Sequence, residues 1–234
     1  MTQASTLPGA LAAILDQDMP MAEALASYAS ELHRLNPTFA SAYDALVERL
    51  RTSDVGAGAP QVGQPMPDFV LPDQSGKLLG LADFIGKGPT VVSINRGHWC
   101  PFCRIELASL DKLHAQLAAD GVQIVSVMPE RQAFTRLVRE RGVQFSVLSD
   151  IDHGYALSLG LAFWVGAELE ILMTNVGRSL PAYQGANGWF LPVPATFVVA
   201  RDGRILARHV DPDFRRNRMG IAEIAAALRA ADNA

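Results

Sequence analysis

Two cysteines, Cys100 and Cys103, are the residues of this chain whose type and spacing are best suited to chemistry. Pro101 follows the first of them, and proline is pre-set for the first position of a helix. The sequence therefore predicts a helix from Pro101 to about Asp120, with Cys100 at its N-cap. Because the free NH groups and the dipole at a helix start favour an anion, this position should lower the pKa of Cys100 and populate the reactive thiolate.

Cys103 lies three residues further on, close to one helical turn, and so shares a face with Cys100. Its sulfur would be close enough to attack an oxidised Cys100 and close a disulfide. Arg96 and His98, just before the pair, would add positive charge beside the thiolate. We interpret the pattern as a redox-active dithiol.

Two other interpretations of the cysteine pair are weaker. A closed zinc site needs four ligands, and neither a second CxxC nor a closely spaced histidine pair follows, so no metal site is expected. Inert core thiols have no reason to share a strand-to-helix corner behind a proline.

The cysteines follow a short apolar strand, Thr90–Asn95, which is rich in β-branched residues. Further strands at Val122–Met128 and Phe145–Leu148, with a helix at Arg131–Arg141, extend a βαβαβ pattern and predict a mostly parallel sheet. Ligands of such sheets bind at the carboxyl ends of the strands, which is where Cys100 is expected.

The rest of the chain divides into an N-terminal extension with a linker, residues 1–60, and a main domain, residues 61–234. The extension carries two apolar stripes with helical spacing. Each stripe must bury against the main domain or against the second subunit of a homodimer. The stripes are Leu25, Tyr28, Leu32 and Leu35, and then Phe39, Tyr43, Leu46 and Leu50. In the main domain we expect a hairpin at residues 68–79, an insertion at residues 162–191 with a helix at Ala167–Asn175, a hairpin at residues 196–207 and a last helix at Gly220–Ala231.

Composition narrows the class of protein. The net charge of -4 and the absence of a large basic cluster argue against a nucleic-acid partner. The densest basic run, residues 215–218, follows two aspartates and is expected to be a solvated, self-compensating surface. No apolar run approaches the length of a membrane span and no signal peptide is evident, so we expect a cytoplasmic protein with no membrane partner, in which a CxxC is more often catalytic than structural.

Several of these segments resemble one family. Trp99–Cys103, Val193–Phe197 and the turn at Asp202-Gly203 are similar to motifs of the thioredoxin-like superfamily. Pro67–Gly76, Thr90–Cys103 and Ser149–Gly160 resemble the peroxiredoxin-like branch of the alkyl hydroperoxide reductase C/thiol-specific antioxidant group, from about Val62 onward. The resemblance implies an α/β thioredoxin-like fold with a helical N-terminal extension and an insertion before the C-terminal hairpin.

The same resemblance implies roles for individual residues. Pro194 would be the cis-proline that faces the dithiol, and Trp99, Pro194 and Thr196 become candidates for substrate contacts, although a strand residue such as Thr196 also has a structural interpretation. The chain departs from typical peroxiredoxins, because Gly97 stands where Thr or Ser precedes the reactive cysteine and the strand after Pro194 has no arginine. Arg96 is the candidate to take the place of that strand arginine. Thioredoxins often carry a buried acid where this chain has Ile94.

These observations favour a thiol-dependent peroxidase that acts through Cys100, Cys103 and Arg96 without a metal or an organic cofactor. Its partners would be a peroxide and an external thiol reductant such as a thioredoxin or glutaredoxin. A protein disulfide oxidoreductase would use the same two sulfurs on protein substrates, and a redox sensor would oxidise once without turnover. A turnover assay with peroxide and a thiol reductant separates these hypotheses.

Overall fold

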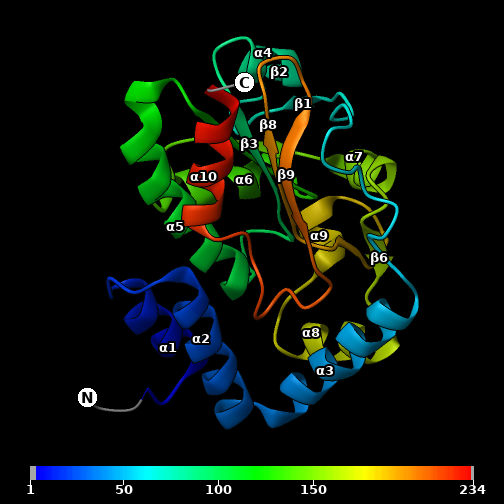
Figure 1. Cartoon of the computed structure of the whole chain (residues 1–234). Coiled ribbons are helices and arrows are strands. Elements are labelled where there is room, and N and C mark those ends of the chain that lie inside the picture. Colours follow the sequence, from blue (N-terminus) through cyan, green and yellow to red (C-terminus); the bar gives the residue numbers. More distant parts are fainter. Residues whose placement is uncertain (1–3, 233–234) are drawn as a thin grey trace.

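A five-stranded mixed sheet forms the centre of the protein (Figure 1). The computed structural model describes residues 4–232. The strands, in the order in which they lie side by side, are β5 (Ser146–Ser149), β4 (Gln123–Met128), β3 (Thr90–Ile94), β8 (Ala195–Val199) and β9 (Ile205–Val210). Strands β3, β4 and β5 are parallel, whereas β8 and β9 are antiparallel to their neighbours. The structure confirms the predicted βαβαβ unit and the hairpin that follows it.

Three helices cover one face of this sheet: α5 (Pro101–Leu117, extended by a 3-10 turn at Ala118–Asp120), α6 (Gln132–Glu140) and α10 (Ile221–Asp232). Alternate strand residues such as Val91, Ile124 and Val198 join one buried cluster with side chains of these helices. This helical layer fixes α5, and with it the cysteines, against β3 and β4.

The opposite face of the sheet is covered by shorter elements. They are the hairpin of β1 (Val70–Pro72) and β2 (Leu78–Gly80), α4 (Leu81–Ile85), the 3-10 turn Ile151–His153 and α7 (Gly154–Ser158). Val92, Val125 and Phe197 point to this side and join the larger buried cluster, which also contains Phe84 of α4. The predicted hairpin at residues 68–79 is therefore confirmed.

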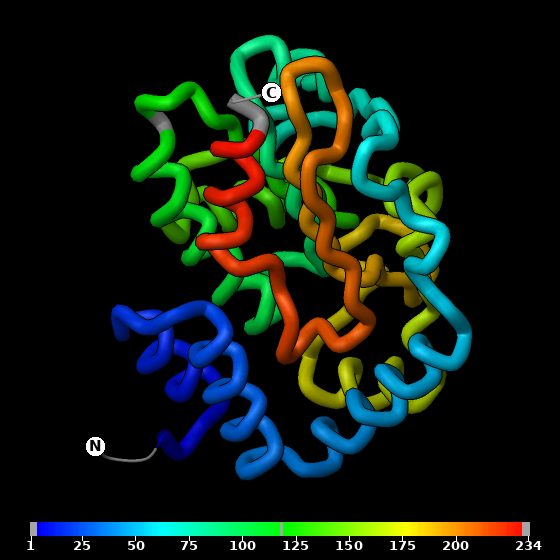
Figure 2. The backbone as a smooth tube through the Cα atoms, in the orientation of Figure 1, coloured from blue at the N-terminus to red at the C-terminus, as the bar shows by residue number. Residues whose placement is uncertain are grey.

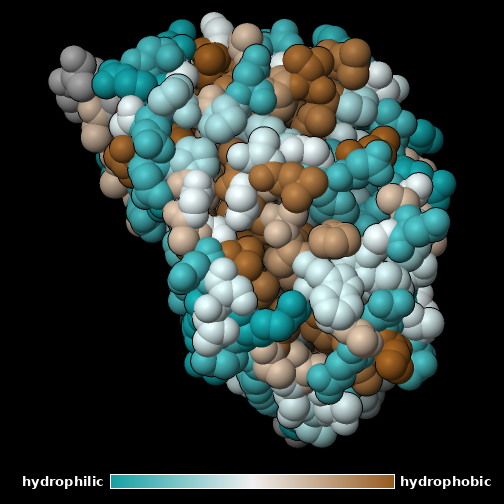
Figure 3. Space-filling view, turned by 90° about the vertical axis from the view of Figure 1, so that its right-hand side faces the viewer, coloured by the Kyte–Doolittle hydropathy of each residue, from teal (hydrophilic) through white to brown (hydrophobic). Residues whose placement is uncertain are grey.

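The insertion contains more structure than the sequence predicted. Helix α8 (Ala167–Asn175) has the expected bounds, and α9 (Leu180–Gln184) and the strand pair β6 (Ala162–Trp164) and β7 (Phe190–Pro192) are additional. Strands of three residues carry too little periodicity to be recognised. Trp164 lies opposite Phe190 in this pair and both are exposed. Strand β6 lies at the right of Figure 1, and Figure 3, which views the molecule from that side, shows apolar groups among hydrophilic ones.

The N-terminal helices close the end of the sheet at which β3 leads into α5 (Figures 1 and 2). They are α1 (Leu7–Leu15), α2 (Met21–Leu35) and α3 (Pro37–Thr52). The Tyr28 ring of α2 packs edge-on against Phe102 of α5, with centroids 5.2 Å apart, and α3 lies beside α8. The two stripes thus bury against the main domain. A homodimer stays a prediction, as does the division at residue 60.

One expectation about surface charge is wrong. Arg215 is buried between Asp213 and Asp44, at 2.9 and 2.6 Å, and Arg218 is buried 3.0 Å from Glu106, whereas the arginine between them is exposed. The acidic partners offset the free-energy cost of burying these charges. The Asp44 pair also ties the segment before α10 to α3, which sequence spacing alone could not indicate.

Because α2 shares its core with the sheet, a cavity in α2 should weaken the whole fold. We predict that Leu25→Ala, at a fully buried position, lowers the free energy of unfolding by about 2–5 kcal/mol in one cooperative urea transition. Leu157→Ala, at an exposed position of α7, is the matched control and should lower the free energy of unfolding by less than about 0.5 kcal/mol. A separate early transition for the N-terminal helices would contradict this prediction.

Candidate active site

Both cysteines lie beneath the protein surface at the start of α5. The Cys100 sulfur accepts a hydrogen bond from the backbone NH of Cys103 at 3.4 Å, as expected of a residue that caps a helix. The Cys103 thiol donates to the same sulfur, with 2.9 Å between the two Sγ atoms. Both side chains are fully buried, so neither cysteine is more shielded than the other.

The two thiols differ sharply in acidity. Burial by itself would raise the pKa of Cys100, but the Cys103 thiol, the Arg96 charge and the Cys103 NH together hold it well below its usual value. Burial, the hydrogen bond to Cys100 and the charge on Cys100 raise the pKa of Cys103 well above its usual value. The reduced site is therefore a thiolate at Cys100 with a protonated thiol at Cys103.

Arg96 supplies the positive charge. Its Nη2 donates to the Cys100 sulfur at 3.2 Å, and the side chain is fully buried. The guanidinium carbon lies 3.5 Å from the ring centre of Phe214 and 5.4 and 5.5 Å from those of Tyr43 and Trp99. Within residues 4–232, no carboxylate pairs with Arg96, and its Nε and Nη1 have no hydrogen-bond partner. Cys100 is its counter-ion, and the guanidinium also acts electrostatically on the Tyr43 hydroxyl.

Glu130, just after β4, shapes the loop that carries Arg96. Its carboxylate accepts hydrogen bonds from the backbone NH of His98 and is 2.8 Å from the ring nitrogen of the same residue. The His98 ring stacks on Phe134, which holds it on Glu130. Gly97 has a φ of +140°, and a Cβ there would lie 2.6 Å from the Glu130 carboxylate. The loop therefore requires glycine where typical peroxiredoxins have Thr or Ser.

Thr196 takes part in a buried polar network one turn further along α5. Its hydroxyl donates to the Glu106 carboxylate at 3.2 Å, and Ser93, opposite it on β3, donates to the same oxygen at 3.1 Å. Arg218 neutralises the acid and also acts electrostatically on Cys103. The site thus has a buried acid, which comes from α5 and not from the position of Ile94.

The other two candidate residues, Trp99 and Pro194, are both buried. The ring of Trp99 borders the guanidinium of Arg96. Pro194 is buried between β7 and β8, and the expectation of a cis bond is wrong, because no described residue has one. The chain stays extended there, since the NH of Val193 donates to Leu161 and β8 begins at Ala195, and trans is the ordinary state of X–Pro bonds.

Sequence patterns missed the aromatic shell around Arg96. Tyr43 and Phe214 contact each other edge-on at 5.0 Å, although they come from α3 and from the segment before α10. Tyr43 belongs to a predicted apolar stripe, which is the one sequence signal that it is buried. Such a stripe does not indicate which residues it packs against. No sequence pattern indicated that Phe214 would contact Arg96.

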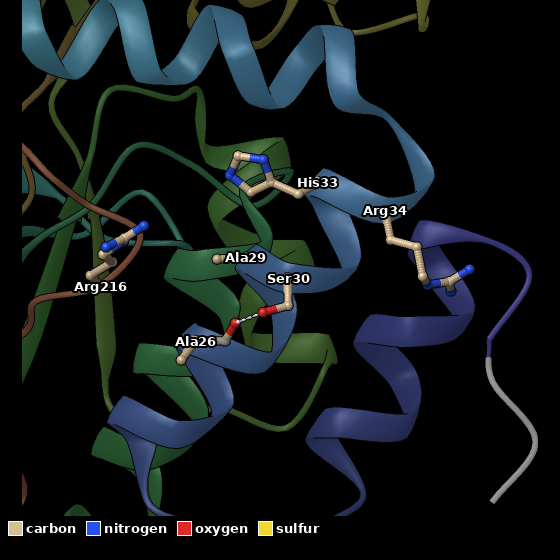
Figure 4. A pocket seen from close by; sticks show the side chains of 6 residues that line it. All are labelled: Ala26, Ala29, Ser30, His33, Arg34 and Arg216. Atoms are coloured by element: carbon tan, nitrogen blue, oxygen red, sulfur yellow. Dashed lines mark hydrogen bonds between the residues drawn. The ribbon is translucent and has the colours of Figure 1, made fainter.

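A surface hollow of about 710 Å³ is not part of this site (Figure 4). Its side chains leave α2 in different directions, with Arg34 reaching toward α1 and Arg216 coming from the segment before α10. Ala26, Ala29, Ser30, His33, Arg34 and Arg216 line it. Arg34 is already paired with Glu31, and neither cysteine borders the hollow.

Residues 4–232 contain neither a cluster of metal ligands nor a helix that could span a membrane. No group of three or more His, Cys, Asp or Glu side chains there is arranged to hold a metal ion. No helix in that range has the length and apolar character needed to cross a membrane.

The pairing of Arg96 with Cys100 leads to a pH prediction. A thiol with a lowered pKa stays ionised to lower pH, so reduced Cys100 should react with iodoacetamide at neutral pH while Cys103 does not. Arg96→Met removes the charge and should move the midpoint of the Cys100 rate profile to higher pH, as measured by mass spectrometry of alkylated peptides. Arg96→Lys should fall between the two, and Arg136→Met, on the exposed side of α6, should match the wild type. An unchanged midpoint in Arg96→Met would refute this electrostatic account.

The sequence is similar to a known protein family and to several characterised proteins. Residues 62–208 match the model of the AhpC/TSA family. Thiol-disulfide oxidoreductase ResA of Bacillus subtilis is 34% identical over 62% of this chain and 64% of its own length. Peroxiredoxin Bcp of Escherichia coli is 26% identical over 66% of this chain and 87% of its own length.

A solved structure supports the fold. Peroxidoxin BcpB of Mycobacterium tuberculosis aligns with 73% of this chain and 97% of its own, at a TM-score of 0.55 and 22% identity. The central sheet, the helix that starts at the cysteines and the C-terminal hairpin are those of a thioredoxin-like fold. Since the family model spans more than half of the sequence and includes both cysteines, the chain belongs to the AhpC/TSA family.

Proposed function

We propose that this member of an oxidoreductase family is a thiol-dependent peroxidase. The observation that carries the proposal is Arg96, a fully buried cation with one nitrogen on the Cys100 sulfur and two nitrogens without a partner. Buried donors are rarely left unused. A peroxide oxygen placed beside the sulfur would accept a hydrogen bond from them.

The first step oxidises Cys100. Its thiolate attacks one peroxide oxygen, an S–O bond forms and the O–O bond breaks, so that the sulfur is oxidised to a sulfenic acid and the peroxide is reduced to an alcohol or water after it takes up one proton. Negative charge develops on the departing oxygen. The guanidinium of Arg96 is already in place to stabilise that charge, in surroundings from which water is excluded.

The second step uses Cys103. Its thiol sulfur attacks the Cys100 sulfenic acid, the S–S bond forms, and the thiol proton leaves with the displaced hydroxide as water. The starting separation of 2.9 Å between the two sulfurs requires little movement. A dithiol reductant, such as a thioredoxin or glutaredoxin, then reduces the disulfide and is itself oxidised.

The second candidate is a thiol-disulfide oxidoreductase, which the similarity to ResA favours. A protein disulfide would have to reach a sulfur with no exposed surface, beside a guanidinium that itself lies against Tyr43 and Phe214. A peroxide needs far less room. We therefore prefer the peroxidase and keep the cytoplasmic location, the homodimer and the substrate contacts of Trp99 as predictions. The hydroxyl of Thr196 is engaged by Glu106, which favours a structural role for it.

A Cys103→Ser variant separates these two functions. Hydrogen peroxide or cumene hydroperoxide should convert its Cys100 to a sulfenic acid that dimedone traps, at a rate well above that of a free thiol of similar pKa. Adding Arg96→Met should slow this step by about 100-fold or more, the effect of losing a preorganised donor. Stopped-flow peroxide consumption with mass spectrometry of Cys100 measures both. A rate no better than that of the free thiol would exclude the peroxidase, and mixed disulfides with proteins would then support the rival.

Disulfide formation should also loosen the N-terminal helices. Oxidation removes the thiolate and leaves the Arg96 charge buried without a counter-ion, which is costly. We predict faster amide hydrogen exchange in α2 and α3 of the oxidised protein than of the reduced one, with α10 unchanged. The difference should disappear in Arg96→Met. Equal exchange in both redox states of the wild type would count against this coupling.

A further inference from the structure

A pocket of about 240 Å³ lies between the N-terminal helices and the start of α5. Its walls come from α1, α2, α3, α5 and the segment after α8, and they are mostly apolar or aromatic, as at Leu32, Phe39 and Phe102. Ligand pockets usually start at roughly 300 Å³, so this one suits a small molecule and not a polypeptide.

The pocket shares a wall with the cysteine site. Tyr28 and Tyr43 line it, and both also interact electrostatically with Cys100. Burial raises the pKa of Tyr28 to about 12, so its hydroxyl is neutral at physiological pH. Pro101 lines the pocket as well, directly after Cys100 in the chain. A molecule in the pocket would therefore contact Pro101 and the two tyrosines that interact with Cys100.

Arg178 gives the pocket a positive charge and has no acidic partner among residues 4–232. Its guanidinium lies 5.8 Å from the ring centre of Phe39 and 5.9 Å from that of Trp99, and it makes no ion pair or hydrogen bond with any residue of the range 4–232. Asn36 also lines the pocket, and its side-chain oxygen accepts from the NH of Phe39, which leaves its amide NH₂ available. No acidic residue is among those that line the pocket.

We propose that this pocket binds a small organic acid, with its apolar body among the aromatic rings and its carboxylate on Arg178 and Asn36. An arginine fork matches a carboxylate in shape and charge. The proposal rests on the peroxidase function and specifies its substrate, an organic hydroperoxide that carries a carboxylate. The N-terminal extension, which lies outside the matched family segment, builds most of this site.

Binding can be tested without peroxide chemistry. Titration calorimetry of the reduced full-length protein with cumyl alcohol and with its para-carboxylate should show about tenfold or tighter binding of the acid, since a hydrogen bond to a charged group contributes that much. Equal affinity for the two alcohols would overturn the proposal.

Two variants assign the selectivity to the pocket. Arg178→Leu should abolish the preference for the acid. Asn36→Asp keeps an N-cap for α3 but places a like charge in the pocket, and should weaken acid binding about tenfold as well. Arg136→Leu, on the exposed side of α6, is the matched control and should keep the preference. Retention of the preference in both pocket variants would overturn the proposal, even if one of them folds poorly.

Steady-state turnover tests whether the pocket binds the substrate of the reaction. The wild type should have a lower KM for para-carboxylated cumene hydroperoxide than for cumene hydroperoxide, and Arg178→Leu should remove that difference. Acid binding without peroxide reduction would refute the peroxidase and leave the pocket intact. Rapid peroxide reduction without selective acid binding would refute the pocket alone.

Discussion

The buried ion pair between Arg96 and Cys100 is the interaction on which this structure most depends. A guanidinium with no exposed surface needs an anion, and the thiolate is the one that the described residues place beside it. Neither charge would be stable there alone, because burial without a partner costs several kcal/mol. The low pKa of Cys100 and the burial of Arg96 are therefore two aspects of one requirement. Catalytic readiness follows from the same requirement, since the thiolate is the reactive form.

Much of the surrounding architecture serves to keep water from this pair. Tyr43 comes from α3 and Phe214 from the segment before α10, and together they cover the guanidinium. Arg215, the residue after Phe214, is fixed by Asp44 of α3, so a second ion pair locks the two covering elements together. The N-terminal helices thus form part of the wall of the candidate active site, although they precede the family segment.

The sequence was informative wherever the physical cause was local. Pro101 predicted the helix start and hence the cap at Cys100, and alternation and turn residues predicted the strands of the central sheet. Contacts between distant segments were not predictable in this way. Phe214 reaches Arg96 only because of tertiary packing, and the short strands of the insertion have too few residues for a period to show. The cis bond at Pro194 was inferred from a resemblance, and the extended chain at that position does not require it.

The departures from typical peroxiredoxins are connected by one geometric cause. When the arginine comes from the loop before the cysteine and not from a later strand, that loop must turn sharply to bring the guanidinium back onto the sulfur. Gly97 permits the required φ of +140°, and the carboxylate of Glu130 occupies the space where a side chain at this position would lie. The strand after Pro194, which has no arginine, instead holds Thr196, whose hydroxyl donates to Glu106. The position of Arg96 in the loop and the need for glycine beside it thus follow from the same turn of the chain, which Glu130 fixes.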